Sequence, residues 1–109
     1  MLFTLCKIAD VPADEPLRVE LSDGHMVAVY HWEGAFYCTD DLCSHGEASL
    51  ADGYVEDGAV VCPYHMGSFC IRSGEPRAAP CSEPIAAYAV TVTDGELQIE
   101  RQVASDRRP

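Results

Sequence analysis

Two short segments, each with one cysteine and one histidine, constrain this 109-residue chain more than any other feature. The first is Cys43-Ser44-His45 and the second is Cys62-Pro63-Tyr64-His65, with sixteen residues between His45 and Cys62. Each segment follows a run of residues typical of a β-strand, so we expect both pairs on loops at strand ends. Two thiolates and two imidazoles from two loops can hold a metal centre, provided that the chain folds so that the loops meet.

Strand signals dominate the rest of the sequence and predict an all-β fold. Pairs of an acidic residue and a glycine separate several short apolar runs, as in two-residue hairpin turns. No stretch combines the apolar period of a helix with caps at both ends. The segment from Arg72 to Pro84 holds Gly74 and three prolines, and we expect it to be a surface connection. The expected strands cover 2–8, 17–21, 26–30, 35–38, 54–56, 59–62, 68–71, 85–92 and 96–100.

Length and charge limit the organisation of the chain and its partners. We expect one domain over 1–101, followed by a polar tail over 102–109. The formal net charge is −11, and residues 1–100 hold four basic residues against seventeen acids. An acidic surface repels nucleic-acid phosphates and anionic lipid heads, so we expect neither nucleic acid nor a membrane as partner. It is compatible with a basic protein partner.

The six cysteines are expected to be thiols or metal ligands and not disulfides. No run approaches the roughly 20 consecutive apolar residues of a membrane span, and the first residues do not resemble a signal peptide. We therefore expect a cytoplasmic protein, in which thiols stay reduced. The four cysteines outside the two segments are expected to be small buried apolar residues: Cys6, Cys38, Cys70 and Cys81.

Two kinds of centre fit the Cys/His pairs: a tetrahedral zinc ion and a two-iron two-sulfur cluster. A single residue between Cys43 and His45 is a tight spacing for two ligands of one tetrahedral ion. A dinuclear cluster is wider, so both cysteines can bind one iron while both histidines bind the other. The spacing favours the cluster and leaves zinc as the alternative.

From Ala35 to Pro80 the sequence resembles the Rieske family of iron–sulfur proteins. Within that family it is similar to the small soluble ferredoxins of bacterial aromatic-ring dioxygenases, such as those serving biphenyl, toluene or cumate. The stretches that carry this closer likeness begin at His45-Gly46-Glu47-Ala48 and at His65-Met66-Gly67-Ser68. The resemblance implies a Rieske iron–sulfur domain: three antiparallel sheets, with two cluster-binding loops at one tip.

The resemblance also implies a function. Such a ferredoxin carries single electrons from a flavoprotein ferredoxin reductase to the terminal oxygenase of a dioxygenase system in aromatic hydrocarbon catabolism. It is not itself an enzyme, and we expect a monomer. One Rieske 2Fe–2S cluster would be bound by Cys43, His45, Cys62 and His65. The alternatives are a small Rieske-fold subunit of an assimilatory nitrite reductase and a structural zinc module.

Departures from the respiratory branch of the family imply a low redox potential. Ala48 and Tyr64 stand where that branch has two cysteines that form a disulfide beside the cluster. Gly67 and Phe69 stand where it has a serine and a tyrosine that donate hydrogen bonds to the cluster. Hydrogen bonds to sulfur stabilise the reduced state, so their loss lowers the potential.

The remaining polar residues suggest surface roles. Neither His25 nor His31 has a ligand-like neighbour in sequence, and we expect both at the surface. Six acidic residues fall within eighteen positions that contain no lysine or arginine. They could form an acidic collar that steers basic partners toward the cluster. The six are Asp40, Asp41, Glu47, Asp52, Glu56 and Asp57.

Overall fold

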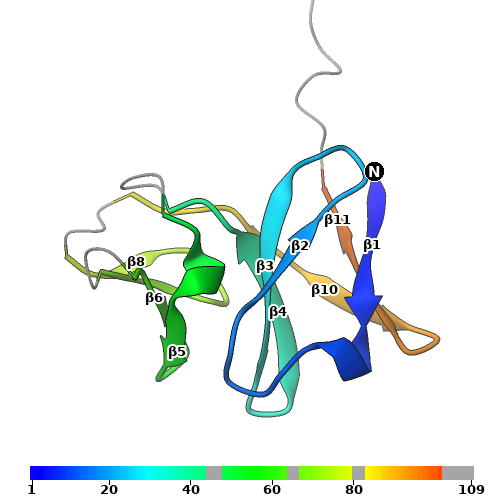
Figure 1. Cartoon of the computed structure of the whole chain (residues 1–109), viewed down its shortest axis with the longest axis horizontal. Coiled ribbons are helices and arrows are strands. Elements are labelled where there is room, and N and C mark those ends of the chain that lie inside the picture. The colour runs from blue at the N-terminus through cyan, green and yellow to red at the C-terminus, as the bar shows by residue number, and fades with distance from the viewer. Residues whose placement is uncertain (44–47, 64–66, 80–82, 102–109) are drawn as a thin grey trace, which may run out of the picture.

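Three antiparallel sheets make up the part of the chain that the computed structural model describes, residues 1–43, 48–63, 67–79 and 83–101 (Figure 1). The terminal sheet has the order β1-β11-β10, from β1 (Leu2–Lys7), β10 (Val90–Thr93) and β11 (Glu96–Glu100). The central sheet has the order β2-β3-β4-β9, from β2 (Leu17–Glu20), β3 (Met26–Trp32), β4 (Ala35–Asp40) and β9 (Ala87–Tyr88). The third sheet has the order β5-β6-β7-β8, from β5 (Tyr54–Glu56), β6 (Ala59–Val61), β7 (Ser68–Cys70) and β8 (Pro76–Ala78). The predicted all-β class and three-sheet architecture are confirmed.

Two short 3₁₀ turns interrupt the strands, over Ile8–Asp10 and Leu50–Asp52. The described part of the chain holds no helix with the length and apolar character that crossing a bilayer requires. The predicted tail over 102–109 lies outside the described residues.

The acidic-residue–glycine pairs form hairpin turns, as predicted. In three of them both residues have positive φ, which gives the turn a twist that matches the flanking strands. The strand register closes directly around these turns, for example Trp32 opposite Ala35 and Glu56 opposite Ala59. The three turns are Glu33-Gly34, Asp57-Gly58 and Asp94-Gly95.

Strand β3 separates two hydrophobic cores. Successive side chains of a strand point to opposite faces of the sheet. Val27 and Val29 therefore enter the core shared with the terminal sheet, together with Leu97 and Ile99. Ala28 and Tyr30 face the other core, which contains Phe69 of the third sheet and the two motif cysteines. The buried residues of the second core are Ala28, Tyr30, Cys43, Ala48, Leu50, Val60, Cys62, Phe69, Ile71 and Ile85.

The segment after β7 differs from the prediction in two ways. The expected surface connection contains β8, an exposed edge strand that pairs with β7 and places Pro76 opposite Phe69. Proline is tolerated there because a strand at a sheet edge can leave one N–H position unpaired. The expected strand over 85–92 is divided into β9 and β10, which belong to different sheets.

The cysteines outside the two motifs lie in different environments. Cys38 is buried, as expected, and burial raises the pKa of its thiol strongly. Cys6 and Cys70 are only partly buried, so the expectation of burial is wrong for them. Burial, then the nearby Asp10 carboxylate, raises the pKa of Cys6. Cys81 lies outside the described residues.

Cys70 shows the opposite pKa direction. Burial alone would raise the pKa of its thiol, but hydrogen bonds from the side chain and backbone of Ser73 and the backbone of Arg72 outweigh burial. The positive charge of Arg77 acts in the same direction, and the net pKa is lowered.

These environments predict an order of thiol reactivity. Alkylation by iodoacetamide at pH 7.5 should modify Cys70 first and Cys6 more slowly, because the thiolate is the nucleophile. Cys38 should react only when the protein is unfolded. Peptide mass spectrometry over time gives the three rates, and reaction of Cys38 as fast as Cys70 in the folded protein would contradict the assignment.

Two glycines with nearly equal positive φ angles allow a matched test of packing. Gly74 has φ +79°, and a Cβ there would lie 2.0 Å from the Ile85 carbonyl oxygen. Gly95 has φ +81°, and a Cβ there would meet nothing within 4 Å. Gly95→Ala should cost about 1–2 kcal/mol from backbone strain alone. Gly74→Ala should cost a further ~1–3 kcal/mol from overpacking. Urea unfolding followed by circular dichroism measures the loss of stability in both variants. Equal unfolding midpoints would show that the backbone at Ile85 moves aside without a cost in stability.

Candidate metal centre

The two motif cysteines open loops that are closed in the same way. Leu42 and Ser49 form an antiparallel bridge at the base of the first loop, and the Cys43 N–H donates to the Ala48 carbonyl at 3.0 Å. The second loop joins β6 to β7, and the Cys62 N–H donates to the Gly67 carbonyl at 2.7 Å. In both loops the cysteine amide is therefore bound to the carbonyl five residues later, which fixes the position of each cysteine.

Both cysteines lie in one hydrophobic core. Cys43 is 1% exposed and Cys62 is 0% exposed, and neither forms a disulfide. The prediction that the fold brings the two loops together is confirmed for the cysteines. His45 and His65 lie outside the described residues.

This donor set fits an iron–sulfur centre. Thiolates are soft ligands that suit iron–sulfur clusters, and both thiols here are shielded from water by the core. The sequence offers one histidine in each loop as a further donor, two residues after Cys43 and three after Cys62.

The buried side chain of Asp41 holds the base of the first loop together. Asp41 is 4% exposed, so it is no part of an acidic surface. Its carboxylate accepts hydrogen bonds from the Ser49 hydroxyl at 2.5 Å and from the Ala51 N–H at 2.9 Å. Its carbonyl accepts a third from the Leu50 N–H at 2.7 Å. Asp41 thereby ties the chain before Cys43 to the chain after the loop.

Asp40 links three segments of the central sheet. The Tyr88 hydroxyl donates to its Oδ1 at 2.6 Å, and His25 Nε2 lies 2.6 Å from the same oxygen. Burial, then the hydrogen bond and charge of Asp40, raises the pKa of Tyr88 to about 12, so the phenol stays protonated as a donor. His25 is thus half-buried and bound to Asp40, whereas we expected it at the surface. His31 is also partly buried and stacks on Phe36, with ring centroids 4.4 Å apart.

The expected acidic collar does not form as a unit. Asp41 is buried and Asp40 is half-buried, whereas Asp52, Glu56 and Asp57 are exposed. Asp57 lies in the turn before β6, and Cys62 follows the other end of that strand. Glu47 lies outside the described residues.

An arginine joins the third sheet to the central sheet. The Arg72 guanidinium lies 5.9 Å from the ring centroids of both Trp32 and Tyr37. Both rings pack against the core that holds the motif cysteines. Such cation–π contacts are worth about 0.5–1 kcal/mol each at exposed sites. No local sequence signal pairs Arg72 with two rings on distant strands.

Comparisons with known proteins agree with this geometry. Residues 1–89 match the model of the family described as the Rieske [2Fe-2S] domain. The chain is 45% identical over 100 residues to the ferredoxin component of the p-cumate 2,3-dioxygenase system of Pseudomonas putida, covering 91% of this chain and 85% of that protein.

Solved structures give the same result. The Sphingomonas yanoikuyae B1 ferredoxin is similar with a TM-score of 0.87 and 41% identity, over 91% of this chain and 97% of that one. A chain from the complex of reduced oxygenase and oxidized ferredoxin in carbazole 1,9a-dioxygenase has a TM-score of 0.84 and 32% identity, over 94% of this chain and 96% of that one. With two buried cysteines at the bases of equivalent loops and a family match over most of its length, the chain belongs to the Rieske [2Fe-2S] domain family.

Proposed function

We propose that this protein is a soluble one-electron carrier of an aromatic-ring dioxygenase system. It would accept electrons from a flavoprotein ferredoxin reductase and pass them to the terminal oxygenase. The observation that carries the proposal is the pair of buried cysteines, each opening a loop closed by the same backbone hydrogen bond, in a chain 45% identical to a dioxygenase ferredoxin component. We further propose that it acts in the cytoplasm as a monomer, within one domain over 1–101.

The proposed cluster ligands are Cys43, His45, Cys62 and His65. When bound, a Rieske cluster supplies reversible one-electron chemistry. Cys43 and Cys62 would hold one iron from within the core, and the two histidines would hold the other. Neutral imidazoles add no negative charge, so two histidines in place of two thiolates ease reduction in a partly dry site.

A carrier of this kind needs no catalytic residue of its own. Its relatives are named as ferredoxin components of dioxygenase systems, and oxidation of the aromatic ring belongs to the oxygenase. This likeness favours the carrier over the small subunit of a nitrite reductase. The zinc alternative is wrong, because the family that the chain belongs to is a [2Fe-2S] family.

Ligand substitutions test the assignment. Cys43→Ser, His45→Ala and His65→Ala should each abolish the visible absorption and the electron paramagnetic resonance signal, because each removes an iron ligand. Cys6→Ser and His31→Gln are matched controls with the same residue types at positions away from the loops, and they should keep full iron and sulfide content. A ligand variant that retains two irons per chain and the wild-type spectrum would refute the assignment of that residue.

The side chains near the second loop predict the redox potential. Phe69 is fully buried and has no hydroxyl, and Gly67 has no side chain to donate. With these donors absent, the midpoint potential should lie near the lower end of the Rieske range, roughly −150 mV. Phe69→Tyr should raise it if the new hydroxyl reaches a cluster sulfur, whereas Phe36→Tyr, in the other core, should not. A redox titration that places the wild-type potential above zero would contradict the prediction.

A further inference from the structure

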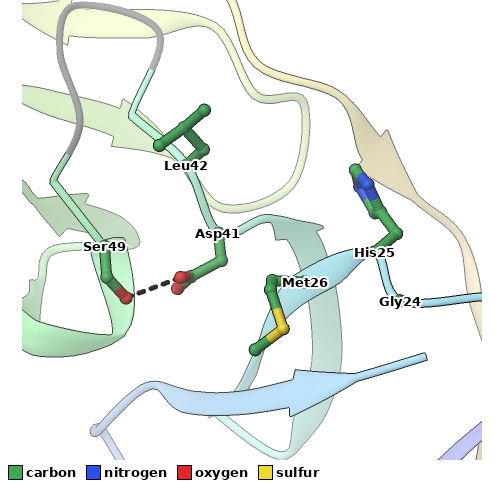
Figure 2. A pocket seen from close by; sticks show the side chains of 6 residues that line it. All are labelled: Gly24, His25, Met26, Asp41, Leu42 and Ser49. Carbon is green, nitrogen blue, oxygen red and sulfur yellow. Dashed lines mark hydrogen bonds between the residues drawn. The ribbon is translucent and has the colours of Figure 1, made fainter.

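A surface cavity of about 360 Å³ lies beside the first cysteine loop. Its walls come from the turn into β3, the chain that follows β4 and the base of the loop. In Figure 2, Leu42 and His25 lie on two sides of the cavity with Asp41 and Met26 between them. The lining residues are Gly24, His25, Met26, Asp41, Leu42 and Ser49.

The polar groups in this cavity already have partners. Asp41 accepts hydrogen bonds from Ser49 and from the Ala51 N–H, and Ser49 also receives one from Arg18 at 3.2 Å. His25 is bound to Asp40 through Nε2. An occupant of the cavity would therefore contact mainly the apolar surface of Met26 and Leu42. Its binding free energy would come mainly from burial of its own apolar atoms.

Leu42 is an exposed apolar side chain on a fixed backbone. Its side chain is among five large hydrophobic ones exposed in the described part of the chain, and it is 59% exposed. Its backbone is bridged to Ser49, and the next residue is Cys43, whose amide closes the loop. A partner that binds Leu42 would thus meet a preformed surface at little cost in ordering, one residue from a proposed cluster ligand.

Negative charge surrounds the cavity. Glu20 is the cross-strand partner of Met26 in the central sheet, so both side chains lie on the same face. Asp23 and Asp40 add two carboxylates near the walls, and Asp23 is paired with Arg101. With Arg18 and Arg101 as the neighbouring cations, and the buried Asp41 left out, carboxylates exceed guanidinium groups by one. The whole chain has a net charge of −11, so the surface disfavours an anion and favours a basic partner.

We propose that this cavity receives an apolar side chain, flanked by basic residues, from the terminal oxygenase when the two proteins dock for electron transfer. The inference rests on the proposed function and adds to it the partner's contact site. A structure of a related ferredoxin includes its oxygenase, which is why the oxygenase is assigned as the occupant. One apolar anchor with charged surroundings suits a contact that must form and dissociate in each cycle.

Leu42→Asp tests this docking site, with Val92→Asp as the matched control. Val92 is 54% exposed on β10 in the terminal sheet, so the control adds the same charge at an equally exposed apolar position away from the cavity. Each cluster-loaded ferredoxin is reduced with dithionite and mixed with the oxidised terminal oxygenase of its own system in a stopped-flow instrument. The dependence of the transfer rate on ferredoxin concentration gives the half-saturating concentration and the limiting rate.

We expect Leu42→Asp to raise the half-saturating concentration about tenfold, as loss of an interface anchor does, and Val92→Asp to leave it within about twofold. The limiting rate should stay unchanged. If Leu42→Asp loads less cluster than wild type, Leu42→Ala replaces it, with an expected loss of about threefold. Equal half-saturating concentrations for the Leu42 and Val92 variants, with wild type transferring electrons normally, would overturn the docking site alone. A wild-type protein that transfers no electron to the oxygenase would overturn the proposed function itself.

Discussion

The structure depends on holding two buried cysteines in one core while each opens a loop at a strand end. Backbone hydrogen bonds do this in both loops, from Cys43 to Ala48 and from Cys62 to Gly67. Each bond lies beside a backbone pairing, because Leu42 forms an isolated bridge with Ser49, and Val61 of β6 pairs with Ser68 of β7. The positions of the cysteines therefore follow from one isolated bridge and one strand pairing.

The rest of the fold supports that arrangement through contacts between sheets. Asp41 closes the first loop from inside with three hydrogen bonds. Arg72 connects the third sheet to Trp32 and Tyr37 of the central sheet. Asp40 holds Tyr88 and His25 together across the central sheet. These polar contacts lie around the core, whose interior holds apolar side chains, the two thiols and the Tyr30 hydroxyl bonded to Thr39.

Much of this could be predicted from sequence, because the relevant signals are local. Turns such as Asp57-Gly58 need positive φ at both positions, and an acidic residue followed by glycine predicts such a turn. The resemblance to the Rieske family implied that the two loops lie at one tip, and Cys43 and Cys62 do lie in one core. The histidine assignments stay predictions.

What sequence reasoning missed depends on contacts between distant segments. Asp41 looked like a surface acid because nothing beside it indicates that Ser49 and Ala51 will donate to it. The edge strand β8 was missed because Pro76 argues against a strand until its pairing with β7 is known. The cavity at Leu42 combines three separate segments, so no single stretch of the chain predicts it.

The alternation along β3 has a consequence for engineering. Val27 and Val29 belong to one core while Ala28 and Tyr30 belong to the other, so the sheet insulates the cysteine core from the terminal sheet. Substitutions that are distant and share no partner usually have additive effects on stability. Substitutions around Leu97 and Ile99 could therefore raise the thermal stability of the protein without changing the redox potential of the cluster.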